Sequence, residues 1–245
     1  MTTAAERVRS QAGYEARTLL ANGEQLLVSL VLPAMALFGL HLASVPDLGP
    51  RRIDVIVPGV LALAVVSTAF TGQAIATGFD RRYGVLRFLG TTPLGRSGLL
   101  AGKAFGVLSV VAVQTVVLAL IGLALGWRPS AVGLPLGVLF VLLGTWTWVA
   151  LALALAGALR AEAVLALANL VWVVVAGLGG LLLPSDELPG AIGTVVHWLP
   201  SGTLGDGMRS ALTGSPGEAL LPLVVLAAWG VAATALALRT FDWSD

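Results

Sequence analysis

The sequence predicts an all-α integral membrane protein with six transmembrane helices. The 245 residues are 57% hydrophobic and only 11% charged, and the mean hydropathy is +0.93. Soluble domains carry about 25% charged residues. The chain also contains six apolar runs that approach or exceed the roughly 20 residues needed to cross a bilayer. A surface this poor in charge would aggregate in water, so we expect lipid to be the solvent.

The first 24 residues are too polar to span and are predicted to form an interfacial helix. Val8, Ala12, Ala16 and Leu19 recur at helical spacing and make a modest apolar stripe. Arginines lie off this stripe, which suits a helix in the headgroup plane. A solvated, frayed tail is the alternative interpretation.

The whole chain, 1–245, is expected to be a single transmembrane domain. Residues 25–77 hold spans one and two, residues 78–103 form a cytoplasmic loop, and residues 104–183 hold spans three to five. The sixth span is residues 217–239. With the N-terminus inside, ten of the fourteen basic residues lie on the cytoplasmic side. The positive-inside rule therefore predicts that both termini are cytoplasmic.

The segment 184–216, between spans five and six, is predicted to contain short re-entrant helices on the outer face. Its apolar pieces, 190–199 and 208–212, are too short to cross a membrane, and a run rich in Pro and Gly separates them. An ordinary surface loop is the alternative.

The spans lack the charged groups that an ion-driven transporter uses. No Asp, Glu, Lys or Arg is expected well inside a span, and such groups usually bind the coupling ion. The notable polar or amphipathic side chains are Gln73, Gln114, Asn169 and Trp172. They are candidates to line a path for a bulky substrate, with packing between helices as the alternative.

Catalytic and metal-binding patterns are missing as well. The chain has no Cys, and His41 and His197 show no metal-ligand spacing. Residues 97–104 resemble a phosphate-binding loop but lack its first Gly and its final Ser or Thr. We therefore expect no catalytic residue, no metal site and no cofactor bound by this chain. The net charge of +1 gives no reason to expect a nucleic-acid partner.

The loop 78–103 is the best candidate for contact with a soluble partner, because it holds five of the fourteen basic residues. As one helix, its first half would place Phe79, Tyr83 and Leu86 on one face and Phe88 beside Arg81 on another. One apolar patch could rest on the bilayer while the other docks into a partner. A headgroup-bound helix without a partner is the alternative.

Three pieces of sequence resemble a known family. Pro58-Gly59 comes first, then FDRRYGVLRFLGTTPLGRSGLLAGK from Phe79 to Lys103, and finally the Pro-containing run that ends at Arg209. Together with six spans and cytoplasmic termini, these resemble the ABC transporter permeases of the type-2 exporter family. The resemblance covers nearly the whole chain.

The resemblance implies the membrane subunit of an ATP-driven exporter. Such a permease pairs with itself or with a sister permease and binds a cytoplasmic ABC ATPase, which holds ATP and Mg, through the loop after the second span. The expected coupling residues are Asp80, Arg81, Arg82, Tyr83, Leu86, Arg87, Phe88, Arg160 and Glu162. An amphiphilic, lipid-like or drug-like substrate would move outward across a bacterial plasma membrane. A membrane scaffold that moves nothing is the alternative.

Overall fold

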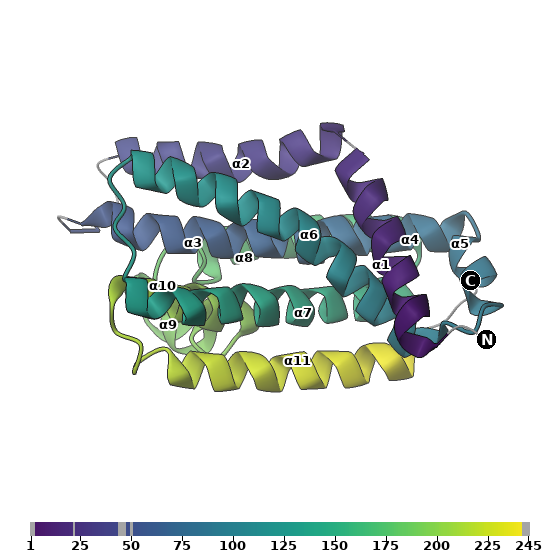
Figure 1. Ribbon diagram of the computed structural model, residues 1–245. Helices are drawn as coiled ribbons and strands as arrows, with labels where there is room; N and C mark the ends of the chain where they lie inside the picture. Colours follow the sequence, from purple (N-terminus) through teal and green to yellow (C-terminus); the bar gives the residue numbers. More distant parts are fainter. Residues whose placement is uncertain (1–2, 22, 44–47, 50, 242–245) are drawn as a thin grey trace.

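The computed structural model describes residues 3–21, 23–43, 48–49 and 51–241, and over these residues it is helical without strands (Figure 1). The helices form one elongated bundle. The helical elements are α1 Ala4–Ala21, α2 Gly23–Leu42, α3 Arg52–Val66, η1 Ser67–Gly72, α4 Gln73–Arg82, α5 Val85–Gly90, α6 Gly95–Ala124, η2 Ala131–Gly133, α7 Leu134–Ala158, α8 Ala161–Leu178, η3 Ser185–Glu187, α9 Ala191–Val196, α10 Pro200–Thr213 and α11 Leu220–Thr240.

Five helical segments in the described part of the chain are long and apolar enough to cross a membrane. They are Arg52–Arg82, Gly95–Ala124, Ala131–Ala158, Ala161–Leu178 and Leu220–Thr240. Each overlaps one of the predicted spans, which identifies a multi-pass membrane protein. The predicted first span corresponds to α2, whose described apolar part, Ser29–Leu42, is shorter. Six spans therefore stay a prediction.

Helix α3 is the centre of the bundle. Every residue from Ile56 to Val66 is buried, and the helix contacts α2, α6, α7 and α10. A helix that is apolar on all sides is typical of a protein core or of a membrane span, and here protein covers it on every side. In contrast, α8 and α11 keep broad exposed apolar faces, which fits contact with lipid.

The third spanning helix begins earlier than its apolar run suggests. The predicted span starts at residue 104, but α6 begins at Gly95 and includes Lys103. The side chain of Lys103 is fully buried, with only 1% exposed. Carboxylates from two other helices neutralise this lysine. The absence of charge well inside the spans stays a prediction.

Helix α1 packs across α6 (Figure 1). Gly98, Gly102 and Gly106 of α6 face α1, and an added Cβ at Gly102 would lie 2.5 Å from Cγ of Gln11. Small residues at four-residue spacing let two helices approach this closely. The prediction of a helix in this region is confirmed, and its half-buried apolar stripe contacts protein. Its place in the headgroup plane stays a prediction.

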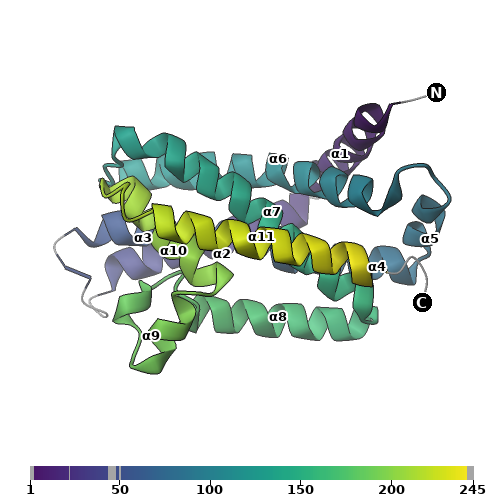
Figure 2. The same cartoon turned by 90° about the horizontal axis from the view of Figure 1, so that it is seen from below.

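The segment between the last two spans contains two short helices, α9 and α10, and its re-entrant placement stays a prediction. The run 200–207 was interpreted as a break, yet Pro200 occupies the first turn of the 14-residue helix α10. Proline suits this position because its missing N–H is not needed there. Figure 2 shows α9 and α10 at one end of the bundle, and α5 with the start of α1 and the end of α11 at the other.

Candidate functional site

The end of the bundle that carries α5 presents an exposed aromatic and basic surface. Gly84, with φ of 77°, separates α4 from α5, so the predicted single helix is two. The side chains of Tyr83 and Phe88 are 74% and 70% exposed, and Arg82 and Arg87 are exposed beside them in sequence. We name these four residues, Arg82, Tyr83, Arg87 and Phe88, the end surface.

Leu86 was predicted to contact a partner, but it is completely buried. A helix as short as α5 anchors itself by burying one large apolar side chain, and Leu86 takes this role. It therefore supports the end surface from beneath and cannot be touched by a docked protein.

Arg81 also points inward. Its Nη1 donates to the backbone carbonyl oxygens of Ala156, Gly157 and Leu159, at 3.3, 3.0 and 3.5 Å. These carbonyls close the C-terminus of α7, where a helix has unpaired acceptors and a partial negative charge. Arg81 therefore fixes α4 to α7.

A second contact joins the end surface to α8. Arg82 Nη1 lies 2.7 Å from Glu162 Oε1, and both side chains are largely exposed. An exposed ion pair contributes only about 0–1 kcal/mol. Arg160 is exposed and precedes the first residue of α8. The structure thus brings Glu162 next to Arg82 and leaves Arg160 and Glu162 accessible. Their contact with the ATPase stays a prediction.

Behind the end surface lies a buried charge cluster. The Nζ atom of Lys103 lies 2.9 Å from Glu15 Oε1 and 3.0 Å from Asp80 Oδ2. Gln11 Nε2 donates to the same Glu15 oxygen at 2.9 Å. Asp80 was expected to contact a partner, and its described contact is this internal one. We name Glu15, Asp80 and Lys103 the lysine cluster.

The lysine cluster links three helices, because Glu15 belongs to α1, Asp80 to α4 and Lys103 to α6. A buried lysine without a partner would carry a desolvation cost of several kcal/mol. Only one packing of α1 and α4 against α6 brings both carboxylates within reach of the ammonium. The cluster therefore fixes the position of α1 relative to the end surface.

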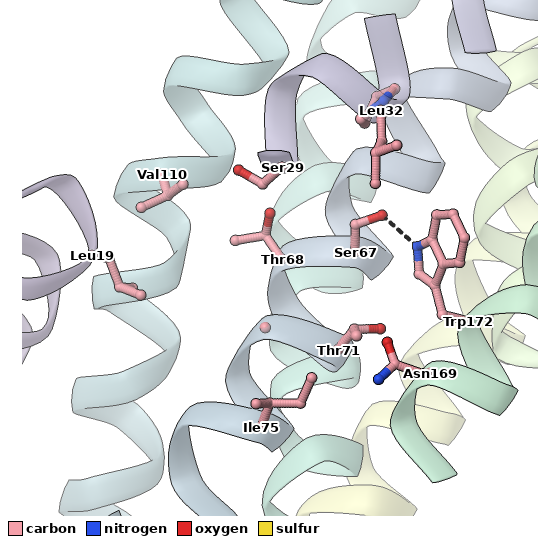
Figure 3. Close-up of a pocket in the computed structure, with 12 residues that line it drawn as sticks. Leu19, Ser29, Leu32, Ser67, Thr68, Thr71, Ile75, Val110, Asn169 and Trp172 are labelled. Atoms are coloured by element: carbon pink, nitrogen blue, oxygen red, sulfur yellow. Dashed lines mark hydrogen bonds between the residues drawn. The ribbon is translucent and has the colours of Figure 1, made fainter. Parts of the chain in front are cut away.

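The middle of the second spanning helix contains an irregularity and a cavity. Residues Ser67–Gly72 form a π-helical turn, a feature that is frequently found at functional sites. A cavity of about 310 Å³ opens beside it, between α2, α8 and the inner part of α6. Trp172 Nε1 donates to Ser67 Oγ at 2.7 Å across this cavity (Figure 3).

Two of the four predicted path residues, Asn169 and Trp172, line the cavity. Gln114 lies one contact away: it accepts from Thr68 Oγ1 at 2.9 Å and donates to the Ser29 carbonyl at 3.0 Å. Gln73 does not line the cavity, because its amide is buried and donates to Thr77. Its Oε1 has no hydrogen-bond partner in the described residues.

The cavity wall is uncharged, with hydroxyl, indole and amide groups among apolar side chains. It could hold an amphiphilic molecule that needs a few hydrogen bonds and no counter-ion.

Comparison with known proteins now adds to this geometry. The model of the family described as "ABC-2 family transporter protein" matches residues 51–239. This stretch includes the end surface, the π-helical turn and five candidate spans. The chain belongs to the ABC-2 transporter family. Among curated proteins, no match to the chain was found.

Membership identifies the chain as a permease component of an ABC transporter, a non-catalytic membrane subunit that works with an ABC ATPase. In this ABC-2 chain, two of the three pieces that resemble the family contact each other: Pro58-Gly59 and the run that ends at Arg209. Arg209 of α10 is buried and donates to the carbonyl oxygens of Gly180, at 2.9 Å, and Leu181. It also donates to Asp206 Oδ1, at 3.0 Å. Burial lowers the pKa of Arg209 to about 10, so the guanidinium stays charged at neutral pH.

The permease has a glycine at position 59 of α3 because other atoms occupy the space that a side chain would need. An added Cβ would lie 2.3 Å from the Leu181 carbonyl oxygen and 2.7 Å from Nη2 of Arg209. No real Cβ tolerates such distances, so the guanidinium and the chain at Leu181 require glycine here. Arg209 and Gly59 together fasten α10 and the end of α8 to α3.

Three important residues of the ABC-2 permease escaped prediction as site residues: Glu15, Lys103 and Arg209. Lys103 and Arg209 were noted only as parts of sequence resemblances. Glu15 lies beside the apolar stripe of α1, and an acidic residue there reads as solvated. The available signal was an acidic residue on a helix with an apolar stripe and, elsewhere in the chain, a lysine among glycines at four-residue spacing. These two residues, Glu15 and Lys103, are 88 positions apart in the sequence, so nothing in the sequence pairs them.

The histidines do not form a catalytic site in the described residues. His197 Nδ1 lies 3.7 Å from Asp206 Oδ2, and Ser185 Oγ donates to the same carboxylate. An activated serine must donate to a base, which a third group orients. Here the carboxylate lies between the serine and the histidine, so this order is absent. The arrangement binds η3 to α10 and is structural.

Proposed function

We propose that this permease is the membrane subunit of an ATP-driven exporter that moves an amphiphilic, lipid-like or drug-like molecule outward. A separate cytoplasmic ATPase would hold ATP and Mg, and a second permease copy would complete the pathway in a bacterial plasma membrane. The observation that carries the proposal is the end surface, which is exposed, aromatic and basic and rests on a rigid support. The uncharged cavity at the π-helical turn supports the choice of substrate.

The end surface has the composition of a protein-binding hot spot. Aromatic and arginine side chains dominate binding energy at interfaces, and this surface has two of each. Arg81, Leu86 and the lysine cluster hold it in place from below. A displacement of Phe88 by a bound ATPase would therefore move α4, the π-helical turn and α1 with it.

Replacing Phe88 or Arg87 by alanine is expected to weaken binding of the ATPase by about 30-fold, since removing a hot-spot side chain costs about 2 kcal/mol or more. The measurement is affinity purification from native membranes in mild detergent, followed by titration of the ATPase that co-purifies. Export should fall in parallel, with no loss of permease from the membrane.

The matched control is Arg51→Ala, an exposed arginine just before α3, which should bind the ATPase normally. Full binding and full export in both Phe88→Ala and Arg87→Ala would contradict the docking proposal. If no ATPase co-purifies with the wild type, the scaffold alternative replaces the transporter.

The cavity at the π-helical turn is the proposed substrate site. Replacing Trp172 by alanine should lower export of a transported amphiphile about tenfold, the effect of losing about 1.4 kcal/mol of contact. Binding of the ATPase should not change. The measurement is uptake of a panel of amphiphilic dyes and lipids into inside-out vesicles.

Leu170→Ala provides the control, because Leu170 lies on the same helix, is 58% exposed and does not line the cavity. Equal export by the two variants would remove the cavity from the substrate path. A loss of ATPase binding in Trp172→Ala would instead show a packing defect.

A further inference from the structure

An apolar groove lies on the opposite half of the bundle from the end surface. It has a volume of about 530 Å³ and runs between α6 and α7, from Leu108 and Leu142 to the loop that joins the two helices. Leu61 of α3 and Met208 of α10 close its floor. Figure 1 shows α6 and α7 diverging toward this loop, with α3 behind them.

The groove is long enough to hold a lipid chain that crosses one leaflet. Along α6 it extends from Leu108 to Leu123, which is about 22 Å at 1.5 Å per residue. The hydrocarbon of one leaflet is about 15 Å thick, half of about 30 Å. Its walls are apolar, and Val116 and Val138 are 58% and 59% exposed. A lipid tail in the bilayer would therefore meet the groove directly.

The joining loop at the mouth of the groove holds one arginine, Arg128, and the carboxylate of Asp54 contacts its backbone. Trp127 and Pro129 line the groove at the joining loop, and Arg128 between them is exposed. Among the described residues, the guanidinium of Arg128 forms no ion pair; only its backbone N–H donates to Asp54, at 3.3 Å. The Nε1 atom of Trp127 is buried there without an acceptor. An anionic headgroup would supply the missing partner for Arg128.

We propose that this groove binds one anionic phospholipid, with an acyl chain between α6 and α7 and the phosphate at Arg128. The apolar lining selects a hydrocarbon chain, and the arginine selects a negative headgroup. The site is separate from the cavity at the π-helical turn and does not depend on transport.

Native mass spectrometry of the detergent-purified complex tests the proposal, with equal amounts of phosphatidylglycerol and phosphatidylcholine added. The wild type should retain one phosphatidylglycerol per chain in preference to phosphatidylcholine. Arg128→Gln should weaken phosphatidylglycerol about fivefold, since one basic residue contributes about 1 kcal/mol near an anionic lipid. Arg51→Gln, at another exposed arginine, should keep the preference.

Ala119→Trp fills the groove and should abolish retention of both lipids. Leu120→Trp, one residue further along and 60% exposed, should retain them because Leu120 does not line the groove. Equal retention by these two tryptophan variants, or no headgroup preference in the wild type, would overturn the proposal.

A second copy of the chain is the competing occupant. The chain has no Cys, so Val116→Cys introduces a single thiol inside the groove. The proposal predicts no disulfide-linked dimer in oxidised membranes. Formation of that dimer, without bound lipid, would assign the groove to a permease–permease interface.

Discussion

Replacing Lys103 by methionine is expected to release α1 from the bundle and to destabilise the permease by about 3–5 kcal/mol, the usual cost of removing one partner of a buried ion pair. Glu15 and Asp80 would be left as neighbouring carboxylates, and Glu15 would be buried. The expected readouts are a lower melting temperature in detergent and faster trypsin cleavage after Arg17, which lies in α1.

Two further variants separate charge pairing from packing. Lys103→Arg keeps the charge and should retain most of the stability. The combination of Lys103→Met with Glu15→Gln and Asp80→Asn removes all three charges and should recover much of the loss, because a neutral cluster carries no unpaired buried charge. If Lys103→Met alone melts and is cleaved like the wild type, the lysine cluster does not hold α1.

Replacing Arg209 by methionine is expected to cost a similar 3–5 kcal/mol. The change leaves Asp206 without its ion pair and removes the donor from the Gly180 and Leu181 carbonyls. Arg209→Lys should rescue little, since a single ammonium cannot reproduce the planar fork of a guanidinium. Thermal unfolding in detergent measures both losses.

Arg51→Met is the matched control, because Arg51 is exposed and such substitutions usually change stability by less than about 0.5 kcal/mol. A double-mutant cycle with Gly59→Ala tests the contact itself. The added Cβ displaces the same guanidinium, so the two losses should not add. Fully additive losses, or an Arg209→Met variant as stable as the control, would contradict this account.

The sequence alone determined the environment of the protein and the general position of its functional surface. Composition required lipid as the solvent, because 11% charge cannot keep a domain of this size in water. Five of the predicted spans correspond to spanning helices, since about 20 apolar residues suffice to mark each one. The loop resemblance pointed to the family that the match over residues 51–239 shows.

Only the tertiary structure decided which loop residues face outward. Phe88 and Leu86 are two positions apart and equally apolar, yet one is exposed and the other is buried. The two residues lie on opposite faces of α5, and the turn at Gly84 decides which face is buried, because a positive φ ends α4 and gives α5 a new axis. A helical wheel assumes one axis, so it separated the two residues onto different faces but could not show that the face of Leu86 is buried by protein.

The tertiary structure also decided the roles of the charges. Lys103 reads as a loop residue and Arg209 as a solvated one, because charged side chains are rarely buried without partners. Their partners, Glu15 and the carbonyls at Gly180 and Leu181, are distant in the sequence. Local sequence determines helix formation and apolar periodicity, but burial of a charge depends on which helices meet. Packing alone determines that.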